Sequence, residues 1–305
     1  MKKNQIAVIT GAQGFIARNL IERLHKEGWK IYGVSRKPFF SSYAQILSWE
    51  EFWEGEILHP SSIDACFHLA AFIPTLMEDS VYANQCIEVN AMLTLKLAEF
   101  MSAHSCTKFI YCSTGNVYGF QNLPVNEQTP LQLERRACFY LSSKFLGETY
   151  VERTRLIKGL NAITFRIAST YGPWMSERAL VSRFAALAKD KKVLRLHYGG
   201  VECFDMIYVD DVVELLFRAA KSSSQGIFNA GSGRSSSVLK IASTVNAIYG
   251  NTIEVIIESE ESFPTQLGFA PLCMNKSIAT FGWEPCALEK GIRLYRNWDE
   301  SRHNQ

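Results

Sequence analysis

Residues 10 to 17 read TGAQGFIA and join a short apolar run to a helical pattern. The run before them, IAVIT, is apolar and β-branched, and Ile16, Leu20 and Leu24 follow at helical spacing. Glycines placed between a strand and a helix allow a tight turn and close approach of the backbone to a pyrophosphate. The stretch therefore predicts a strand, a turn and a helix that bind a dinucleotide, with contacts from Gly11, Gln13, Gly14, Phe15 and Ile16. A flexible turn without a ligand is the alternative.

More apolar runs follow, and helical stretches separate them. Alternating strands and helices imply a parallel sheet with right-handed crossovers. The fold class is therefore α/β, with a Rossmann-type doubly wound parallel sheet. The segment 35–62 has little pattern and is expected to be irregular, with at most one short strand. The predicted strands span 6–10, 30–34, 64–71, 108–114 and 161–168, with a helix at 91–103 among the crossovers.

The alternation of strands and helices becomes less regular after residue 170. In that part of the chain the sequence predicts a helix at 179–189, a strand and a helix at 207–220, and a polar loop at 232–237. With 305 residues, the chain exceeds what one core of usual size needs. We expect a dinucleotide-binding domain over 1–168 that also receives roughly 204–230. A smaller, interleaved substrate-binding lobe is expected from 169–203 and 231–305.

Charge and cysteine content exclude several partners. The chain has 32 basic and 30 acidic side chains and no long basic run, so no nucleic acid partner is expected. No apolar run reaches the roughly 20 residues of a membrane span, and the start MKKNQIAVIT reads as a strand rather than a signal peptide. Eight scattered cysteines without CxxC or Cys/His spacing read as reduced thiols, with no metal site. We expect a cytoplasmic protein.

The end of the second predicted strand carries Ser35, Arg36 and Lys37. An NAD-binding turn usually has an acidic residue at this distance from the glycines, and a carboxylate would repel a 2′-phosphate. Serine and arginine can instead bond that phosphate, the guanidinium through charge-assisted hydrogen bonds. The residues therefore predict NADP(H) as cofactor, bound by Ser35 and Arg36, although a solvated pair of surface cations would look the same.

The stretch FYLSSKF places Tyr140 and Lys144 four residues apart. On a helix these positions share one face, so the phenol and the ammonium can meet one ligand. A phenol with a pKa near 10 is a poor base at neutral pH, and a neighbouring ammonium together with the positive charge of a nicotinamide would favour its phenolate. An ordinary, partly exposed helix pair is the alternative.

Taken together, the motifs resemble those of extended short-chain dehydrogenases/reductases, the group that contains nucleotide-sugar epimerases, dehydratases and 4-ketoreductases. The resemblance covers nearly the whole chain. The motifs that carry it are TGAQGFIA, DACFHLAA, VN at 89–90, STGNVYG, YLSSK, FRIASTYGP, IYVDDV, FNAGSG and FGWEP.

The resemblance implies roles for individual residues. Tyr140 would be the acid/base, Lys144 its partner and donor to the nicotinamide ribose, and Thr114 the hydroxyl that holds the substrate oxygen. His68 reads as a packed strand residue, while Asn90 and Ser113 either line the site or are structural. A homodimer is usual for the family. The further cofactor contacts implied are Leu69, Ala70, Ala71, Asn90, Ser113 and Ile167, besides Tyr140 and Lys144.

The sequence departs from the family pattern at the residues that directly follow Thr114. The 4,6-dehydratases carry carboxylates there that eliminate water, whereas this chain has Gly115 and Asn116. Dehydration loses its acid and base, and hydride transfer remains. The predicted substrate contacts are Thr114, Asn116, Ser169 and Arg178.

Further departures affect diphosphate binding. Ser169 replaces the usual asparagine, Phe204 stands beside Asp205 where an arginine is common, and no arginine occurs in FPTQLGFAPLCMNKS. The arginines that could substitute, each of them otherwise a solvated surface charge, are Arg178, Arg183, Arg195 and Arg234.

The sequence therefore predicts NADPH-dependent reduction of the 4-keto group of a nucleotide-linked deoxysugar, with the nucleotide sugar as small-molecule partner. The alternative is a nucleotide-sugar 4-epimerase that retains NAD(P). A third reading, a non-catalytic dinucleotide-sensing protein, would not need Thr114, Tyr140 and Lys144 together.

Overall fold

A computed structural model describes residues 5–55, 63–75, 80–119, 121, 124–133, 137–258 and 268–303. Within these ranges no helix is both long and apolar enough to cross a membrane.

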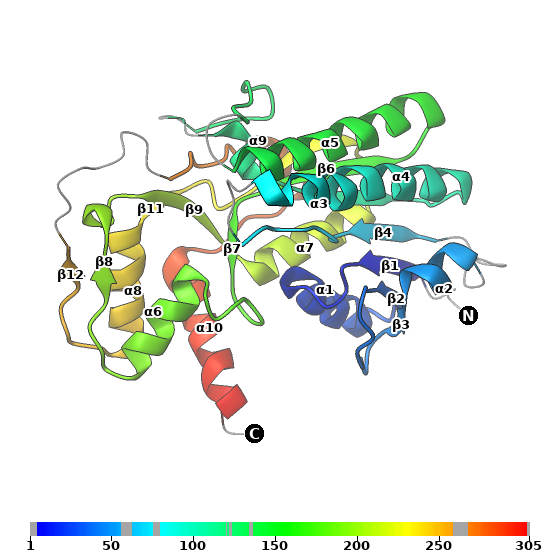
Figure 1. Ribbon diagram of the computed structural model, residues 1–305. Helices are drawn as coiled ribbons and strands as arrows, with labels where there is room; N and C mark the ends of the chain where they lie inside the picture. The colour runs from blue at the N-terminus through cyan, green and yellow to red at the C-terminus, as the bar shows by residue number, and fades with distance from the viewer. Residues whose placement is uncertain are drawn as a thin grey trace.

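The centre of the molecule is a seven-stranded, all-parallel sheet (Figure 1). The order β10-β6-β5-β4-β1-β2-β3 reverses direction at β1, as in a doubly wound fold. β1 is buried at all five residues, as expected of a parallel strand covered on both faces. The strands are β1 (Ile6–Thr10), β2 (Lys30–Val34), β3 (Gln45–Leu47), β4 (Ala65–His68), β5 (Phe109–Thr114), β6 (Ala162–Ile167) and β10 (Gly226–Ala230).

Helices cover both faces of this sheet (Figure 1). On one face α1 (Phe15–Lys26) and α7 (Val209–Ala220) pack on a core that includes Ile9 and Phe165. On the other face α4 (Leu93–Ala103) and α5 (Cys138–Lys158) enclose a second core. The predicted α/β fold is therefore confirmed.

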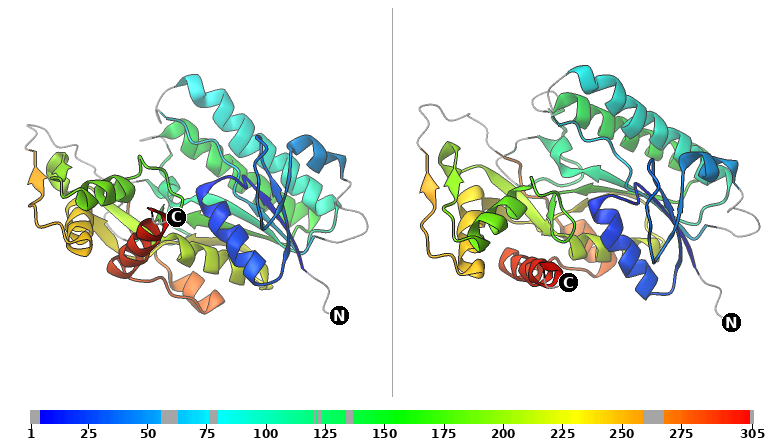
Figure 2. Two further views of the ribbon diagram at one scale, coloured as in Figure 1. Left: turned by 90° about the horizontal axis from the view of Figure 1, so that it is seen from below. Right: turned by 60° about the horizontal axis from the view of Figure 1, so that its bottom comes forward.

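A smaller lobe lies beside the large sheet (Figure 2). It contains a three-stranded sheet, β11-β9-β7, a two-stranded sheet, β12-β8, and a third apolar core. The later strands and helices are β7 (Ser169–Tyr171), α6 (Leu180–Lys189), β8 (Arg195–Leu196), β9 (Cys203–Tyr208), β11 (Ser235–Ser237), α8 (Val238–Tyr249), β12 (Ile256–Ile257), α9 (Asn275–Phe281) and α10 (Leu288–His303).

Three expectations about local structure were wrong. The strand predicted over 64–71 ends at His68, and the loop after it passes close to Gly11 of the glycine-rich turn. The segment expected to be irregular contains α2 (Trp49–Glu54) besides the short strand that was allowed for, β3. Part of the expected polar loop forms β11, which pairs with β9. A π-helix (Ile87–Met92), about which no prediction was made, precedes α4.

Candidate active site

The glycine-rich turn lies directly against the loop that follows β4. Gly11 has φ 68°, and a Cβ there would lie 2.8 Å from both the Cα and the nitrogen of Ala70. The Gly14 N–H donates to the Gly11 carbonyl at 2.7 Å and closes the turn. Gly14 also precedes α1, where no side chain caps the helix. The first amides of α1 are thus available to an anion.

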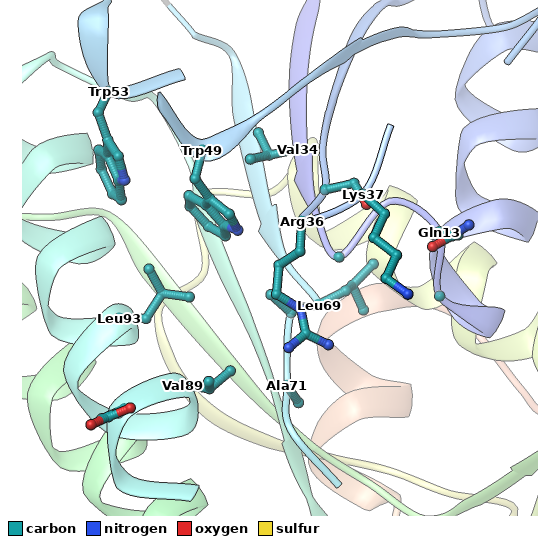
Figure 3. A pocket seen from close by; sticks show the side chains of 15 residues that line it. Gln13, Val34, Arg36, Lys37, Trp49, Trp53, Leu69, Ala71, Val89 and Leu93 are labelled. Carbon is teal, nitrogen blue, oxygen red and sulfur yellow. The ribbon is translucent and has the colours of Figure 1, made fainter. Parts of the chain in front are cut away.

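A cavity of about 700 Å³ opens at this turn (Figure 3). It runs along the carboxyl ends of β1, β2 and β4, which is where doubly wound sheets bind their ligands. Eight of the predicted cofactor contacts line it: Gly11, Gln13, Gly14, Ser35, Arg36, Leu69, Ala70 and Ala71. Its size and its glycine cradle fit the adenosine diphosphate part of a dinucleotide.

Two cations stand at one wall of this cavity. The side chains of Arg36 and Lys37 are exposed and make no ion pair or hydrogen bond with any described residue. In Figure 3, Arg36 lies between the Trp49 indole and Lys37. Ser35 is almost fully buried, and its N–H donates to the Leu47 carbonyl. No carboxylate neutralises these two charges in the described part of the chain, so they remain available to an anionic group.

Sequence reasoning missed part of the cavity wall. Trp49 and Trp53 of α2 stack at 5.4 Å between ring centroids and close one end of the cavity. A capping box between Ser48 and Glu51 starts this helix, and its S-x-x-E pattern could have predicted it. The other lining residues not predicted as cofactor contacts are Val34, Lys37, Glu88, Val89 and Leu93.

Phe15 and Ile16, although predicted as cofactor contacts, do not line the cavity. Both are partly buried and pack against the core beneath α1.

Tyr140 and Lys144 lie one turn apart on α5. Lys144 is only 2% exposed, and its Nζ donates to the Cys112 carbonyl at 2.7 Å. This bond fixes α5 against β5, two residues before Thr114 at the carboxyl end of that strand. The three predicted catalytic residues therefore belong to two neighbouring elements at the same edge of the sheet.

Burial dominates the electrostatics of this pair. It raises the pKa of Tyr140 to about 12, with a further contribution from Cys86. It also lowers the pKa of Lys144 to about 8, which Cys112 and Glu148 partly offset. The Lys144 ammonium bonds to the Cys112 carbonyl and is not a cause of the Tyr140 shift, and stabilisation of the phenolate by Lys144 together with a nicotinamide charge stays a prediction. The raised pKa favours the protonated form of the Tyr140 phenol in this arrangement.

The Thr114 hydroxyl caps the short helix η4 (Gly115–Tyr118) by accepting from the Asn116 N–H at 3.2 Å. No described residue accepts a hydrogen bond from this hydroxyl, so its proton is available to a ligand. Behind it lies a small hollow, whose walls include Asn116, Ser169 and the buried Asp205. Arg178, also predicted as a substrate contact, is exposed and does not line this hollow.

Asn90 holds the chain in place rather than lining the cavity. Its amide bonds both backbone groups of Phe72 and donates to the Ser143 hydroxyl at 3.0 Å. Ile167 lies next to Thr114 in the register of β5 and β6. Ser113 differs, because its hydroxyl is buried and has no hydrogen-bond partner in the described structure. An orphaned hydroxyl beside Thr114 fits a role in ligand binding.

Asp205 organises the wall of the hollow. Its carboxylate accepts hydrogen bonds from the N–H and hydroxyl of Ser232 and from the N–H groups of Gly233 and Leu272. Phe204 contacts Phe269 at 6.3 Å between ring centroids, where the family pattern has an arginine. The candidate replacements Arg178, Arg183, Arg195 and Arg234 are all exposed.

No metal-binding constellation supplements this site. The described residues contain no group of three or more His, Cys, Asp or Glu side chains that could hold a metal ion.

Comparisons with known proteins agree with this arrangement. The model of the NAD dependent epimerase/dehydratase family matches residues 7–231. The UDP-glucose 4-epimerase of Mycolicibacterium smegmatis is 27% identical over 317 residues, covering 93% of this chain and 95% of that protein.

Solved structures share the fold. The UDP-glucose 4-epimerase of Thermotoga maritima, solved with UDP-glucose, superposes with a TM-score of 0.84 at 22% identity, covering 98% of this chain and all of that one. A UDP-glucuronic acid 4-epimerase variant of Bacillus cereus, in complex with UDP-4-deoxy-4-fluoro-glucuronic acid and NAD, gives 0.82 at 21% identity and covers 97% and 99%. With a family match over most of its length and the glycine-rich turn in place, the chain belongs to the NAD dependent epimerase/dehydratase family.

Proposed function

We propose that the protein is a nucleotide-sugar 4-epimerase. The observation that carries this proposal is the set of Thr114, Tyr140 and Lys144 at one sheet edge, beside a hollow whose carboxylate is already engaged. Asp205 accepts hydrogen bonds from three residues and is not free to act as an acid or base. The similarity to 4-epimerases supports the same reading and places the reductase predicted from the sequence second.

The chain's own residues would act on the sugar hydroxyl at C4. Tyr140 exchanges the hydroxyl proton, and the Thr114 hydroxyl donates a hydrogen bond to the same oxygen. Lys144 would hold the nicotinamide ribose, and its charge together with that of an oxidised nicotinamide would favour the phenolate that Tyr140 needs in order to accept the hydroxyl proton. A bound nicotinamide dinucleotide supplies acceptance and return of the hydride. Epimerisation then requires the keto sugar to present its other face.

We propose NADP(H) as the cofactor, bound by Arg36 with help from Lys37 and Ser35. Two cations without carboxylate partners favour a 2′-phosphate over a free ribose hydroxyl. The NAD in the Bacillus cereus relative makes NAD the competing choice.

Reduction of a 4-keto nucleotide sugar is the second candidate, and the same two cations favour it. A reductase exchanges its cofactor in every turnover, which suits NADPH, whereas an epimerase gains by retaining one cofactor.

The two functions predict different behaviour of the purified protein. For the epimerase, we expect protein that retains a dinucleotide and interconverts two nucleotide sugars, such as UDP-glucose and UDP-galactose, without added cofactor. Solvent isotope should not appear at carbon, because the hydride returns directly. Protein without bound cofactor that oxidises one NADPH per keto sugar would instead establish the reductase. Intact protein inactive in both assays would overturn both.

A further inference from the structure

The ammonium of Lys144 lies on an aromatic ring. Its Nζ is 4.4 Å from the centroid of the Tyr111 ring, within the range of a cation–π interaction. The Cys112 carbonyl accepts its hydrogen bond at 2.7 Å. The buried ammonium therefore contacts both a ring face and a carbonyl.

Tyr111 is itself fixed on several sides. It is fully buried, and its hydroxyl lies 3.4 Å from the Asn90 carbonyl and 3.3 Å from that of Lys144. A Cβ on Gly147 would lie 2.3 Å from this hydroxyl, so α5 can approach the ring only because residue 147 is glycine. His68 stacks beside the ring with centroids 5.5 Å apart and an interplanar angle of 29°.

Hydrogen bonds orient the His68 ring. The Thr94 hydroxyl donates to the Asn90 carbonyl at 2.8 Å, so it accepts from His68 Nε2. His68 Nδ1 then accepts from the Thr10 hydroxyl at 2.7 Å, and Thr10 accepts from the Ala70 N–H. If the imidazole is neutral and protonated at Nε2, each donor in this series of hydrogen bonds has an acceptor. Burial and the nearby Lys144 lower the pKa of His68 to about 3, in agreement with neutrality.

The chain of bonds connects the two halves of the site. It begins at Ala70 of the cofactor cavity and ends at Asn90, whose side chain reaches Ser143 on α5. The stacked layer of His68, Tyr111 and Lys144 crosses from β4 over β5 to the same helix.

We propose that Tyr111 is the positioning residue of Lys144, and that His68 holds Tyr111 in place. The ring keeps the ammonium charged and directed at the carboxyl edge of β5, where it meets the nicotinamide ribose. This inference deepens the proposed function, since it rests on a dinucleotide at that site.

The pKa values of the groups that face Lys144 allow the charge of Lys144 to be followed in a pH titration. They are Tyr140 and Glu148 on its own helix, Tyr111 and Cys112 on β5, and His68 on β4. Burial raises the pKa of Tyr140 and Cys112 to about 12 and raises the pKa of Tyr111 well above its usual value, whereas the pKa of His68 is lowered to about 3. Between pH 7 and 10, Lys144 is therefore the titrating group of this layer.

The test is the affinity for NADPH between pH 7 and 10, followed by cofactor fluorescence on the full-length protein. We expect wild type to lose affinity with a midpoint near the Lys144 pKa of about 8. Lys144→Met should abolish this pH-dependent loss of affinity. The variant thereby distinguishes titration of Lys144 from that of Lys108, whose pKa is also about 8 but whose Nζ bonds Asn161 and Ser224.

The matched pair is Tyr111→Leu and Tyr111→Phe. Loss of the ring should move the midpoint down by about 0.4 to 1.5 pH units, the worth of a cation–π contact, while phenylalanine should leave it nearly unchanged. Equal midpoints for leucine and wild type, or equal shifts in both variants, would overturn the proposal. Retention of the step in Lys144→Met would do the same.

If Tyr111→Leu does not fold, fluorinated phenylalanines at position 111 keep the shape and weaken only the ring face. The midpoint should then fall stepwise with each added fluorine, and a constant midpoint would refute the cation–π role. Failure of the proposed function would look different, because the protein would then not interconvert nucleotide sugars although the Tyr111 variants still shifted the midpoint of NADPH binding.

Discussion

Arg36→Ala tests the origin of cofactor choice. Charge-assisted hydrogen bonds contribute about 1.5 to 3 kcal/mol. Arg36 is exposed, so solvent screens it, and Lys37 beside it keeps part of the attraction. We therefore expect the lower value, about 1.5 kcal/mol, which corresponds to a roughly tenfold weaker NADPH complex. NADH, which lacks the phosphate, should bind almost as before.

The measurement is the ratio of the NADPH and NADH dissociation constants, from fluorescence titrations at low and high salt. Arg36 makes no ion pair with a described residue, so the variant should unfold at the wild-type temperature. Arg178→Ala removes another exposed arginine outside the cavity and should leave both constants unchanged. Equal weakening of both cofactors in Arg36→Ala would refute the assignment of the 2′-phosphate to this residue.

Three more predictions follow from the described contacts. Tyr140→Phe should lose about two to four orders of magnitude in turnover yet bind cofactor normally, and wild-type turnover would exclude it as the acid. Glu148→Leu leaves the buried guanidinium of Arg166 without its partner, so denaturant unfolding should report a loss of about 3 to 5 kcal/mol; a loss below 1 kcal/mol would contradict this. His68 is protonated more readily in the unfolded chain, where its pKa is 6.5, than in the folded protein, where its pKa is about 3. The contribution of neutral His68 to the free energy of unfolding is therefore complete above pH 6.5. It decreases as the pH is lowered from 6.5 toward 3, by at most about 1.4 kcal/mol per pH unit, and His68→Gln should remove this pH dependence.

Much of the fold follows from short-range patterns in the sequence. The boundaries of β1 and β2 were predicted to the residue, and the helix between them was predicted from Ile16, Leu20 and Leu24, because a β-branched run, paired glycines and helical spacing each act within a few positions. The same local signals predicted Gly11, Gln13, Gly14, Ser35 and Arg36 of the candidate cofactor cavity, since the carboxyl ends of parallel strands meet at one edge of the sheet. The lining residues Leu69, Ala70 and Ala71 were predicted only from the family resemblance.

The lobe and α2 were harder to predict. The serines at 235–237 are typical of a loop in the sequence, and they form a strand because they pair with β9. The six residues of α2 show little apolar periodicity. Short elements of this kind depend on contacts made elsewhere in the chain.

Only the tertiary structure decided how the candidate catalytic pair, Tyr140 and Lys144, is supported. Nothing in FYLSSKF indicates that Lys144 bonds to Cys112 and lies on Tyr111, since those residues stand about thirty positions earlier in the chain. The neutral state of His68 likewise depends on Thr10 and Thr94, which the register of β1 with β4 and the docking of α4 bring to its two nitrogens. Sequence spacing determined which chemical groups the site contains, whereas burial and hydrogen bonding between distant segments determined their pKa values and orientation.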